Sequence, residues 1–492
     1  MKIIFTIIEQ GHFREGLIYK ANRMWTPNVT AIMAEMQRQK GHDVTILDAN
    51  ACGWENRVLS KKIVEQSADL VVLMTQPSDR WQNPYPSIAR QKNFVRTLRK
   101  TGYDGLFLAV GPHPTLLPEN FLTEIPEVDY IVRGEPEIGV DQFIDRVVQK
   151  RPYDGVPGLS SRVMGDVVHF GDEKPVHNLD DLPMPAYDIL PMEKYQHHFY
   201  SQVTDPRHRF AFIETNRGCP FGCSFCNLAL YGRTIRRFSV ARILAEIDLL
   251  VEKYGVNYLF FGDLTFGINR KDTEELLRGL IERKYALRWS CQTRVDMIDS
   301  DLILLMSQAG CHRIEAGIET AQAFLMKRVK NVRTQQLENL VQALNQANIK
   351  LESGHLVGLP NQSVRQVWQS ARVLKKIGVR FKITSVTVPY PGTDDYAQGL
   401  KEGKIKLKDW QSIVAAAGKS GNKLTDRKIQ VAIFIVQCLY YWHIFTSGVG
   451  GVLSSMPHLQ AAWRGFQRLF YRPRDGAGAI KRTFEDVVYG AE

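Results

Sequence analysis

The first 145 residues alternate short apolar runs with amphipathic stretches. The apolar runs have the length of buried strands and lie at 2–8, 43–48, 69–75, 105–111 and 128–133. Between the first two, residues 28–40 have the pattern of a helix, with Pro27 before it and Gly41 after it. Strands separated by helices predict an α/β fold with a doubly wound parallel sheet of the flavodoxin or Rossmann type. Ligands of such sheets bind beyond the carboxyl ends of the strands.

Glycine and proline are concentrated just after three of the predicted strands. These segments are residues 76–81, 111–115 and 133–137. Such residues let the backbone approach a ligand closely, and they also serve simply to turn the chain. The pattern by itself favours neither interpretation.

The rest of the chain divides into three further regions. Residues 146–205 contain six prolines and few periodic stretches, which is typical of a linker. A second series of strands and helices at 206–400 predicts a partial (βα)6 TIM-like barrel. We expect residues 401–492 to form a helical C-terminal region, so the predicted domains are 1–145 and 206–400, joined by the linker.

Two strands of the second series carry polar residues at every second position. These residues are Ser290, Gln292 and Arg294 in one strand, and Arg313, Glu315, Gly317 and Glu319 in the other. Because the alternate face of a barrel strand packs on helices, the polar face must line the lumen. Buried charge needs a partner, so the lumen is expected to hold a polar ligand. The alternative is a purely structural network of ion pairs.

Three cysteines with the spacing C-x3-C-x2-C form the most specific motif of the chain: Cys219, Cys223 and Cys226. Three thiolates on one loop can ligate three irons of a [4Fe–4S] cluster and leave the fourth iron open, whereas ferredoxin-type carriers use four. The motif therefore predicts a cluster that binds a small molecule at its open iron. The alternative, three cysteines packed as small hydrophobic residues, does not explain the spacing.

Composition indicates a cellular compartment but does not identify a binding partner. The 492 residues carry a net charge of +11, which suits anionic cofactors, an anionic membrane or nucleic acid alike. The four other cysteines are scattered, which argues against a disulfide framework and predicts a reducing, cytoplasmic compartment. The first apolar run is too short for a secretion signal.

The cysteine motif and its context resemble the radical S-adenosylmethionine (SAM) superfamily. The resemblance implies that the three cysteines hold a [4Fe–4S] cluster whose open iron chelates SAM, and that the reduced cluster cleaves SAM to methionine and a 5′-deoxyadenosyl radical. It also implies a set of SAM-binding residues: Phe225, Gly262, Asp263, Gln292, Arg294, Glu315, Glu319 and Gly358. One departure is Asp263, which stands where the family usually has glutamate.

The glycine- and proline-rich segments of the first domain resemble those of the cobalamin-binding branch of this superfamily. The cobalamin-binding residues implied are Arg80, Trp81, Gly111, Pro112, His113, Thr115, Gly134 and Glu135. The D-x-H-x-x-G motif that supplies a cobalt-ligating histidine elsewhere is absent from the chain. The resemblance therefore implies cobalamin with its own base displaced and no protein imidazole on cobalt, with Arg80 or Trp81 at the lower face.

The C-terminal region carries an apolar stretch at 429–445 without Lys, Arg, Asp or Glu. Its 17 residues are short for a membrane span, so we expect a buried helix that roofs the barrel. Apolar residues at helical spacing with arginines beside them follow at 459–474. They predict a packed helix with a basic solvated face or, alternatively, a helix on an anionic membrane.

The resemblance implies a cobalamin-dependent radical SAM methyltransferase that methylates an unactivated carbon. One alternative is oxidative cyclisation, ring contraction or carbon–carbon bond formation with the same cofactors; another is a non-catalytic cobalamin or Fe–S sensor. The implied partners are a reductant such as flavodoxin or ferredoxin and a small-molecule substrate, with no nucleic acid. Similar tails in relatives favour an apolar substrate (a lipid, isoprenoid or tetrapyrrole) and peripheral contact with the inner face of the membrane.

Overall fold

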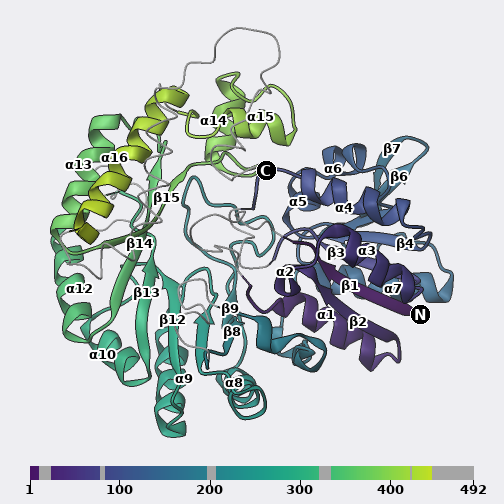
Figure 1. The fold of residues 1–492 in the computed structure, drawn as a ribbon, viewed down its shortest axis with the longest axis horizontal. Helices are drawn as coiled ribbons and strands as arrows, with labels where there is room; N and C mark the ends of the chain where they lie inside the picture. Colours follow the sequence, from purple (N-terminus) through teal and green to yellow (C-terminus); the bar gives the residue numbers. More distant parts are fainter. Residues whose placement is uncertain (10–23, 78–83, 197–206, 321–333, 422–423, 446–492) are drawn as a thin grey trace.

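Two parallel sheets lie next to each other in the computed structural model of the chain (Figure 1). The structure describes residues 1–9, 24–77, 84–196, 207–320, 334–421 and 424–445. Arg80 and Trp81 and the basic helix expected at 459–474 lie outside these ranges. The two-sheet α/β architecture expected from the apolar pattern is confirmed.

The first sheet has the strand order β2-β1-β3-β4-β5-β6-β7. Its parallel strands are β1 (Lys2–Ile7), β2 (Asp43–Asp48), β3 (Leu70–Met74), β4 (Leu106–Val110) and β5 (Tyr130–Val132). The main helices are α1 (Asn28–Gln39), α3 (Asn56–Glu65), α4 (Ala89–Lys100) and α7 (Pro136–Gln149). Helix α1 packs beside α7 and α3 beside α4, and right-handed crossovers place these pairs on opposite faces.

An antiparallel hairpin extends this sheet within the segment where we expected only a linker. Strands β6 (Leu159–Val163) and β7 (Asp166–His169) pair with each other, and β6 pairs with β5. Met164 and Gly165 make the turn with φ of 52° and 100°. Only the start of β6 is buried, so no continuous apolar run marks the hairpin in the sequence.

The second sheet is the predicted partial (βα)6 barrel, with all six strands parallel in the order β8-β11-β12-β13-β14-β15. Its strands are β8 (Phe210–Ile213), β11 (Tyr258–Phe261), β12 (Arg288–Thr293), β13 (Cys311–Ala316), β14 (Lys350–Val357) and β15 (Arg380–Val386). The helices between them are α8 (Val240–Tyr254), α9 (Arg270–Arg283), α10 (Ser300–Gln308), α12 (Thr334–Gln346) and α13 (Val364–Lys376).

Side-chain caps begin four of these helices. Ser239, Asn269, Asp299 and Ser363 each accept a hydrogen bond from a backbone N–H of the first turn. Such caps satisfy donors that have no partner inside the helix, and each contributes about 1 kcal/mol. The local sequence therefore specifies where these barrel helices start.

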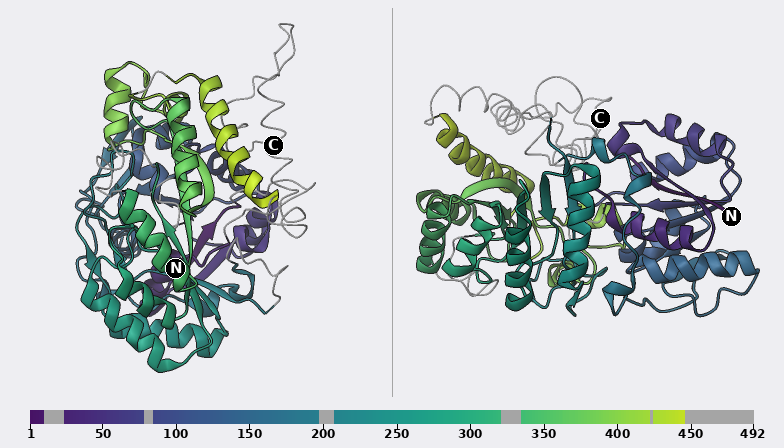
Figure 2. Two further views of the ribbon diagram at one scale, coloured as in Figure 1. Left: turned by 90° about the vertical axis from the view of Figure 1, so that its left-hand side faces the viewer. Right: turned by 90° about the horizontal axis from the view of Figure 1, so that it is seen from below.

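The C-terminal region adds α14 (Asp394–Lys401), α15 (Trp410–Ala415) and α16 (Asp426–Phe445). Helix α16 packs along α13 and against β15 through Ile429, Ala432 and Val436 (Figure 2). A helix thus covers the expected stretch and buries Ile429, Ala432 and Val436, but it flanks the last strands and does not roof the barrel. Among the described helices, none is both long and apolar enough to cross a membrane.

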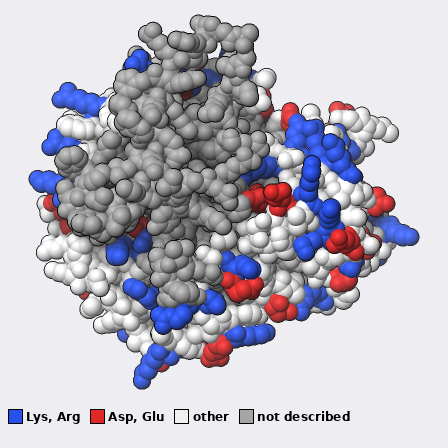
Figure 3. All heavy atoms as spheres, in the orientation of Figure 1, with Lys and Arg blue, Asp and Glu red and all other residues white. Residues whose placement is uncertain are grey.

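Charged residues of both signs are interspersed on the described surface of the face shown in Figure 3. Ion pairs of the described residues include Arg38 with Asp188 and Lys40 with Asp145.

Candidate functional site

The three motif cysteines lie on a loop that leaves the carboxyl end of β8, which we call the cysteine loop (residues 218–235). The loop is closed at its base by two short antiparallel strands, β9 (Asn216–Arg217) and β10 (Arg236–Arg237). Gly218 starts the loop with φ of 90°, and a Cβ there would collide with the carbonyl oxygen of Thr234. Only glycine fits this close approach.

All three cysteines lie at the barrel mouth, and none of the three is in a disulfide bond. Cys219 is buried with Sγ 3.7 Å from Thr265 Oγ1, and Cys223 and Cys226 are half-buried. In the described part of the chain, no three His, Cys, Asp or Glu side chains converge on one metal-ion position. A cubane is ligated at separate corners, so its cysteines surround a volume and need not meet at a point. The donor set therefore fits a three-cysteine cluster.

Arg294 places a positive charge beside the cysteines. Its Nη1 lies 3.7 Å from Cys223 Sγ, its guanidinium lies 3.8 Å above the Phe221 ring, and Asp296 holds it at 2.7 Å. Burial lowers the pKa of Arg294, but Asp296 and the cysteine sulfurs outweigh burial and raise it. A fixed cation stabilises thiolates, the form of cysteine that binds iron. The family resemblance implies that Arg294 binds SAM, and the structure places it against the cysteine loop.

Asp263 supports the base of the same loop. Its Oδ1 accepts hydrogen bonds from the backbone N–H groups of Thr215 and Asn216 at 2.6 and 3.1 Å, and its Oδ2 accepts from Thr215 Oγ1 at 2.5 Å. Burial raises the pKa of Asp263 to about 7 despite these bonds. Asp263, which the resemblance implies as a SAM-binding residue, thus already accepts hydrogen bonds from three protein donors.

Two glycines from the predicted SAM site are required by packing. A Cβ on Gly262 would overlap the Phe212 ring, and a Cβ on Gly358, whose φ is 96°, would overlap Gly418. Both positions would need glycine in the absence of any ligand. Their place in the family motif is thus explained by the barrel itself.

The lumen face of the barrel carries a buried ion pair and also polar residues that are more exposed. Arg313 forms a buried ion pair with Glu352 at 2.6 Å, as the structural alternative anticipated. Gln292 is exposed and Glu315 is half-buried, and the two are in register on neighbouring strands. Phe225 on the cysteine loop and Glu319, just beyond β13, are also half-buried.

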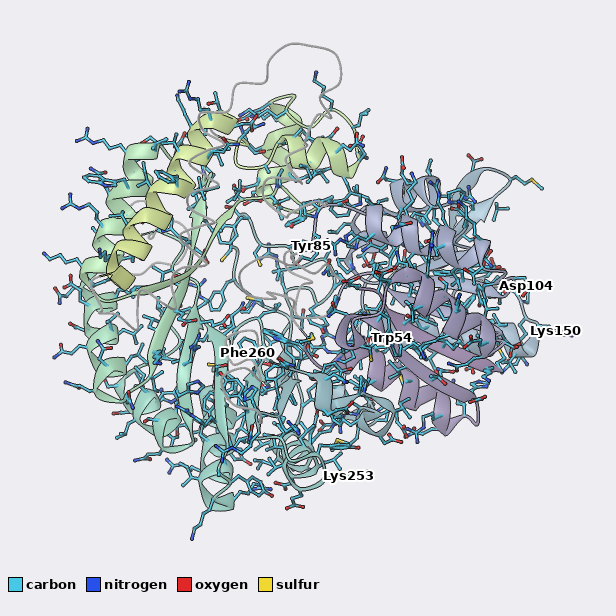
Figure 4. The ribbon with its side chains drawn as sticks, in the orientation of Figure 1. Trp54, Tyr85, Asp104, Lys150, Lys253 and Phe260 are labelled. Carbon is cyan, nitrogen blue, oxygen red and sulfur yellow. The ribbon has the colours of Figure 1, made fainter. Side chains whose placement is uncertain are left out.

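The carboxyl-end edge of the first sheet is largely bonded to itself. Fully buried His113 has Nε2 2.8 Å from the carbonyl oxygen of Tyr85, a residue on the barrel side of the domain (Figure 4). Burial lowers the pKa of His113 to about 4, so its ring is neutral. Thr115 donates to Gly111 O at 2.7 Å and accepts from Gly134 N at 3.0 Å. Pro112 opens a short helix, α5 (Pro112–Leu116).

Glu135, a predicted cobalamin-binding residue, is turned away from a ligand role by its partners. One carboxylate oxygen pairs with Arg217 and the other with Arg236, 2.5 Å away, and the side chain is 1% exposed. Both oxygens are thus engaged by the base of the cysteine loop. No local pattern in the sequence links residue 135 to residues 217 and 236.

The carboxyl-end edges of the two sheets face each other across the domain interface. Glu135 after β5 meets the strands that flank the cysteine loop. His113 after β4 packs edge-on to Trp410, with ring centroids 5.2 Å apart. Tyr390 after β15 donates a 2.5 Å hydrogen bond to Pro84 O after β3. Ligands bound at either edge would therefore lie in one shared space.

Comparison with known proteins agrees with this arrangement. Residues 213–374 match the Radical SAM superfamily. An uncharacterised methyltransferase of Pyrococcus horikoshii is 27% identical over 386 residues, covering 77% of this chain and 80% of the relative. The anaerobic magnesium-protoporphyrin IX monomethyl ester cyclase of Rubrivivax gelatinosus is 26% identical over 402 residues, covering 80% and 69%. The cobalamin-dependent radical SAM methyltransferase TokK of Streptomyces tokunonensis is 32% identical over 213 residues, covering 42% and 30%.

Two solved structures share the whole layout. The radical SAM methyltransferase TsrM of Kitasatospora setae has a TM-score of 0.64 at 15% identity, covering 82% of this chain and 77% of TsrM. The cobalamin-dependent SAM radical enzyme OxsB has a TM-score of 0.67 at 14% identity, covering 96% and 70%. At such identities the likeness shows the fold. The chain therefore contains a radical SAM domain at residues 213–374, within a fold that TsrM and OxsB share.

Proposed function

We propose that this chain is a cobalamin-dependent radical SAM methyltransferase that methylates an unactivated carbon. The observation that carries the proposal is the facing of two ligand-binding sheet edges, one of them bearing the cysteine loop. When bound, the cluster with SAM supplies the initiating radical and cobalamin supplies the methyl carrier. Several relatives are named as methyltransferases, which supports this choice.

The residues would divide the work by position. Cys219, Cys223 and Cys226 ligate the cluster, and Arg294 holds their thiolate form through its charge. Gln292 and Glu315, in register on neighbouring strands, would orient the polar methionyl end of SAM, and Phe225 would lie against its adenine. The packed interface around these groups excludes water from the radical chemistry.

The first-sheet edge would hold cobalamin through backbone and small side chains around Gly111, Thr115 and Gly134. His113 Nδ1 has no hydrogen-bond partner among the described residues, so it can accept one from a bound polar group. Nε2 is already bonded to Tyr85, and the ring is buried against Trp410. We therefore expect EPR spectra of bound cob(II)alamin without superhyperfine coupling from an imidazole nitrogen. Such coupling would contradict this arrangement.

Radical SAM enzymes act on small molecules and need an electron donor, for which we propose flavodoxin or ferredoxin. We further propose an apolar substrate such as a lipid, isoprenoid or tetrapyrrole. The match to a magnesium-protoporphyrin ester cyclase over 80% of the chain supports this class. A cytoplasmic enzyme that touches the inner membrane face through its C-terminal region would suit such a substrate.

The same cyclase match favours a second candidate, oxidative cyclisation without methyl transfer. SAM with a trideuterated methyl group separates the two in an anaerobic extract assay with a strong reductant. Methyl transfer requires two SAM molecules per product, so S-adenosylhomocysteine and 5′-deoxyadenosine should form together and the product should gain an intact CD3 group. An unlabelled cobalamin-dependent product with 5′-deoxyadenosine alone would reject the methyltransferase.

A further inference from the structure

A buried ionic cluster joins the two domains at the base of the cysteine loop. Arg217 and Arg236 face each other across β9 and β10, where the loop begins and ends. Both guanidinium groups contact one carboxylate, that of Glu135 from the first domain: Arg217 pairs with Oε1, and Arg236 Nη1 lies 2.5 Å from Oε2. The three side chains are 0%, 6% and 1% exposed.

Further partners surround Arg217. Glu137 Oε1 lies 2.7 Å from its Nη1, and Glu214 Oε2 lies 3.3 Å from its Nε. Tyr231, which belongs to the cysteine loop, donates a 2.8 Å hydrogen bond to Glu214 and lies with its ring 5.1 Å from the guanidinium carbon. Arg236 donates to the Tyr231 carbonyl oxygen at 3.1 Å. The ionic cluster therefore contacts the loop at its start, its end and a point between them.

The first domain holds its side of this contact firmly. Gly134, the neighbour of Glu135, donates its N–H to Thr115 Oγ1, which in turn donates to Gly111 O after β4. Glu135 Oε2 also accepts from the backbone N–H of Val176 at 3.2 Å. These hydrogen bonds at Gly134 and Val176 thus hold Glu135 in place independently of the two arginines.

Stability alone does not account for so many buried charges. Apolar residues of similar size commonly stabilise a core as well as a buried ion pair does, because desolvation offsets the Coulomb attraction. What an arginine and carboxylate add is orientation, since the planar guanidinium fixes direction through several donors. Arg217 is separated from Cys219 only by Gly218, so the orientation of Arg217 determines where the loop leaves the strand.

We propose that Glu135, which lies in the first domain, is a positioning residue for the cysteine loop of the barrel. By bridging Arg217 and Arg236 it holds the two ends of the loop together and sets where the three cysteines stand. The inference rests on the assignment of the cluster to those cysteines. It gives the conspicuous 133–137 segment a role in shaping the iron site, distinct from contact with cobalamin.

The test uses the full-length, anaerobically reconstituted protein and the variant Glu135→Gln, which keeps the size and removes the charge. We expect iron to be lost to a chelator about tenfold faster, as for other partners that orient metal ligands. The EPR spectrum of the reduced cluster should broaden, and amide hydrogen exchange should accelerate in residues 215–237. Glu173→Gln is the matched control, because Glu173 pairs with Arg133 at 3.6 Å in the same domain.

The results separate positioning from mere structural support. Parental iron retention, EPR spectrum and loop exchange in Glu135→Gln, even with a lower melting temperature, would overturn the proposal. If that variant does not fold, Arg236→Lys replaces it, because it keeps the charge and loosens only the bridge; parental iron retention and EPR there would overturn the proposal equally. A parent chain that binds no iron would refute the cluster assignment itself.

Discussion

The carboxyl-end edge of the first sheet and the lumen of the barrel both carry conspicuous polar motifs, yet the structure uses them differently. At the first edge, His113 and Thr115 are bonded to backbone, and Glu135 is bonded to arginines of the other domain. In the lumen, Gln292 is exposed and Glu315 is half-buried. A motif thus marks a place in the fold, and only its bonding partners tell whether its polar groups can bind a ligand.

The largest expected effect concerns the three cysteines of the cysteine loop. Replacement of Cys219, Cys223 or Cys226 by Ala should abolish SAM cleavage, because the cluster loses an iron ligand. The parent should bind about four irons per chain after anaerobic reconstitution. Cys52→Ala is the control, since Cys52 is also half-buried but lies in the first domain. SAM cleavage by the triple variant would refute the assignment.

A second prediction tests the claim that Gly262 serves packing. Gly262→Ala forces a methyl group into the Phe212 ring, so the free energy of unfolding should fall by about 1–3 kcal/mol. Denaturant titration of the apoprotein measures the change. Gly222→Ala in the exposed cysteine loop, where the nearest atom lies 3.9 Å from the added Cβ, should leave stability near that of the parent. An unchanged denaturation midpoint for Gly262→Ala would show that the Phe212 ring moves aside and that packing does not require glycine there.

Buried His113, at the carboxyl-end edge of the first sheet, should make the stability of the protein depend on pH. Because the pKa of His113 is lowered to about 4 in the folded state, the unfolded chain binds more protons between that pH and about 6.5. His113 therefore contributes stability that is complete above about pH 6.5 and is lost as pH falls toward 4, by at most about 3 kcal/mol. His113→Gln should flatten this part of the stability profile. A variant profile parallel to the parent's would show that His113 is not held neutral.

The smallest effect should come from Gln292, an exposed residue on the lumen face of the barrel. Gln292→Ala should weaken SAM binding about tenfold by removing one polar contact, with no change in melting temperature. Equilibrium dialysis with the reconstituted protein measures the binding, and Gln39→Ala, at an exposed position at the end of α1, serves as its control. A large loss of stability would show that Gln292 is a structural residue. It would contradict the difference between the first-sheet edge and the barrel lumen.

Much of the fold follows from local pattern. The five parallel strands of the first sheet and helix α1 begin and end within two residues of their predicted bounds, because buried parallel strands need continuous apolar runs. The hairpin β6–β7 was missed because its outer residues are exposed. At the site, the three cysteines were evident from spacing, whereas the partners of Asp263 and Arg294 were not.

The sequence by itself determined the two α/β units and the three-cysteine loop, since periodicity and ligand spacing are local properties. Only the tertiary structure decided which polar residues remain available to ligands. Glu135 meets arginines 82 and 101 residues away, and Asp263 meets a turn 48 residues before it. The Glu135 pairings depend on how the two sheets pack edge to edge, and the Asp263 contacts depend on the pairing of β8 with β11 in the barrel. Burial then makes them obligatory, because a charge removed from water must find a partner.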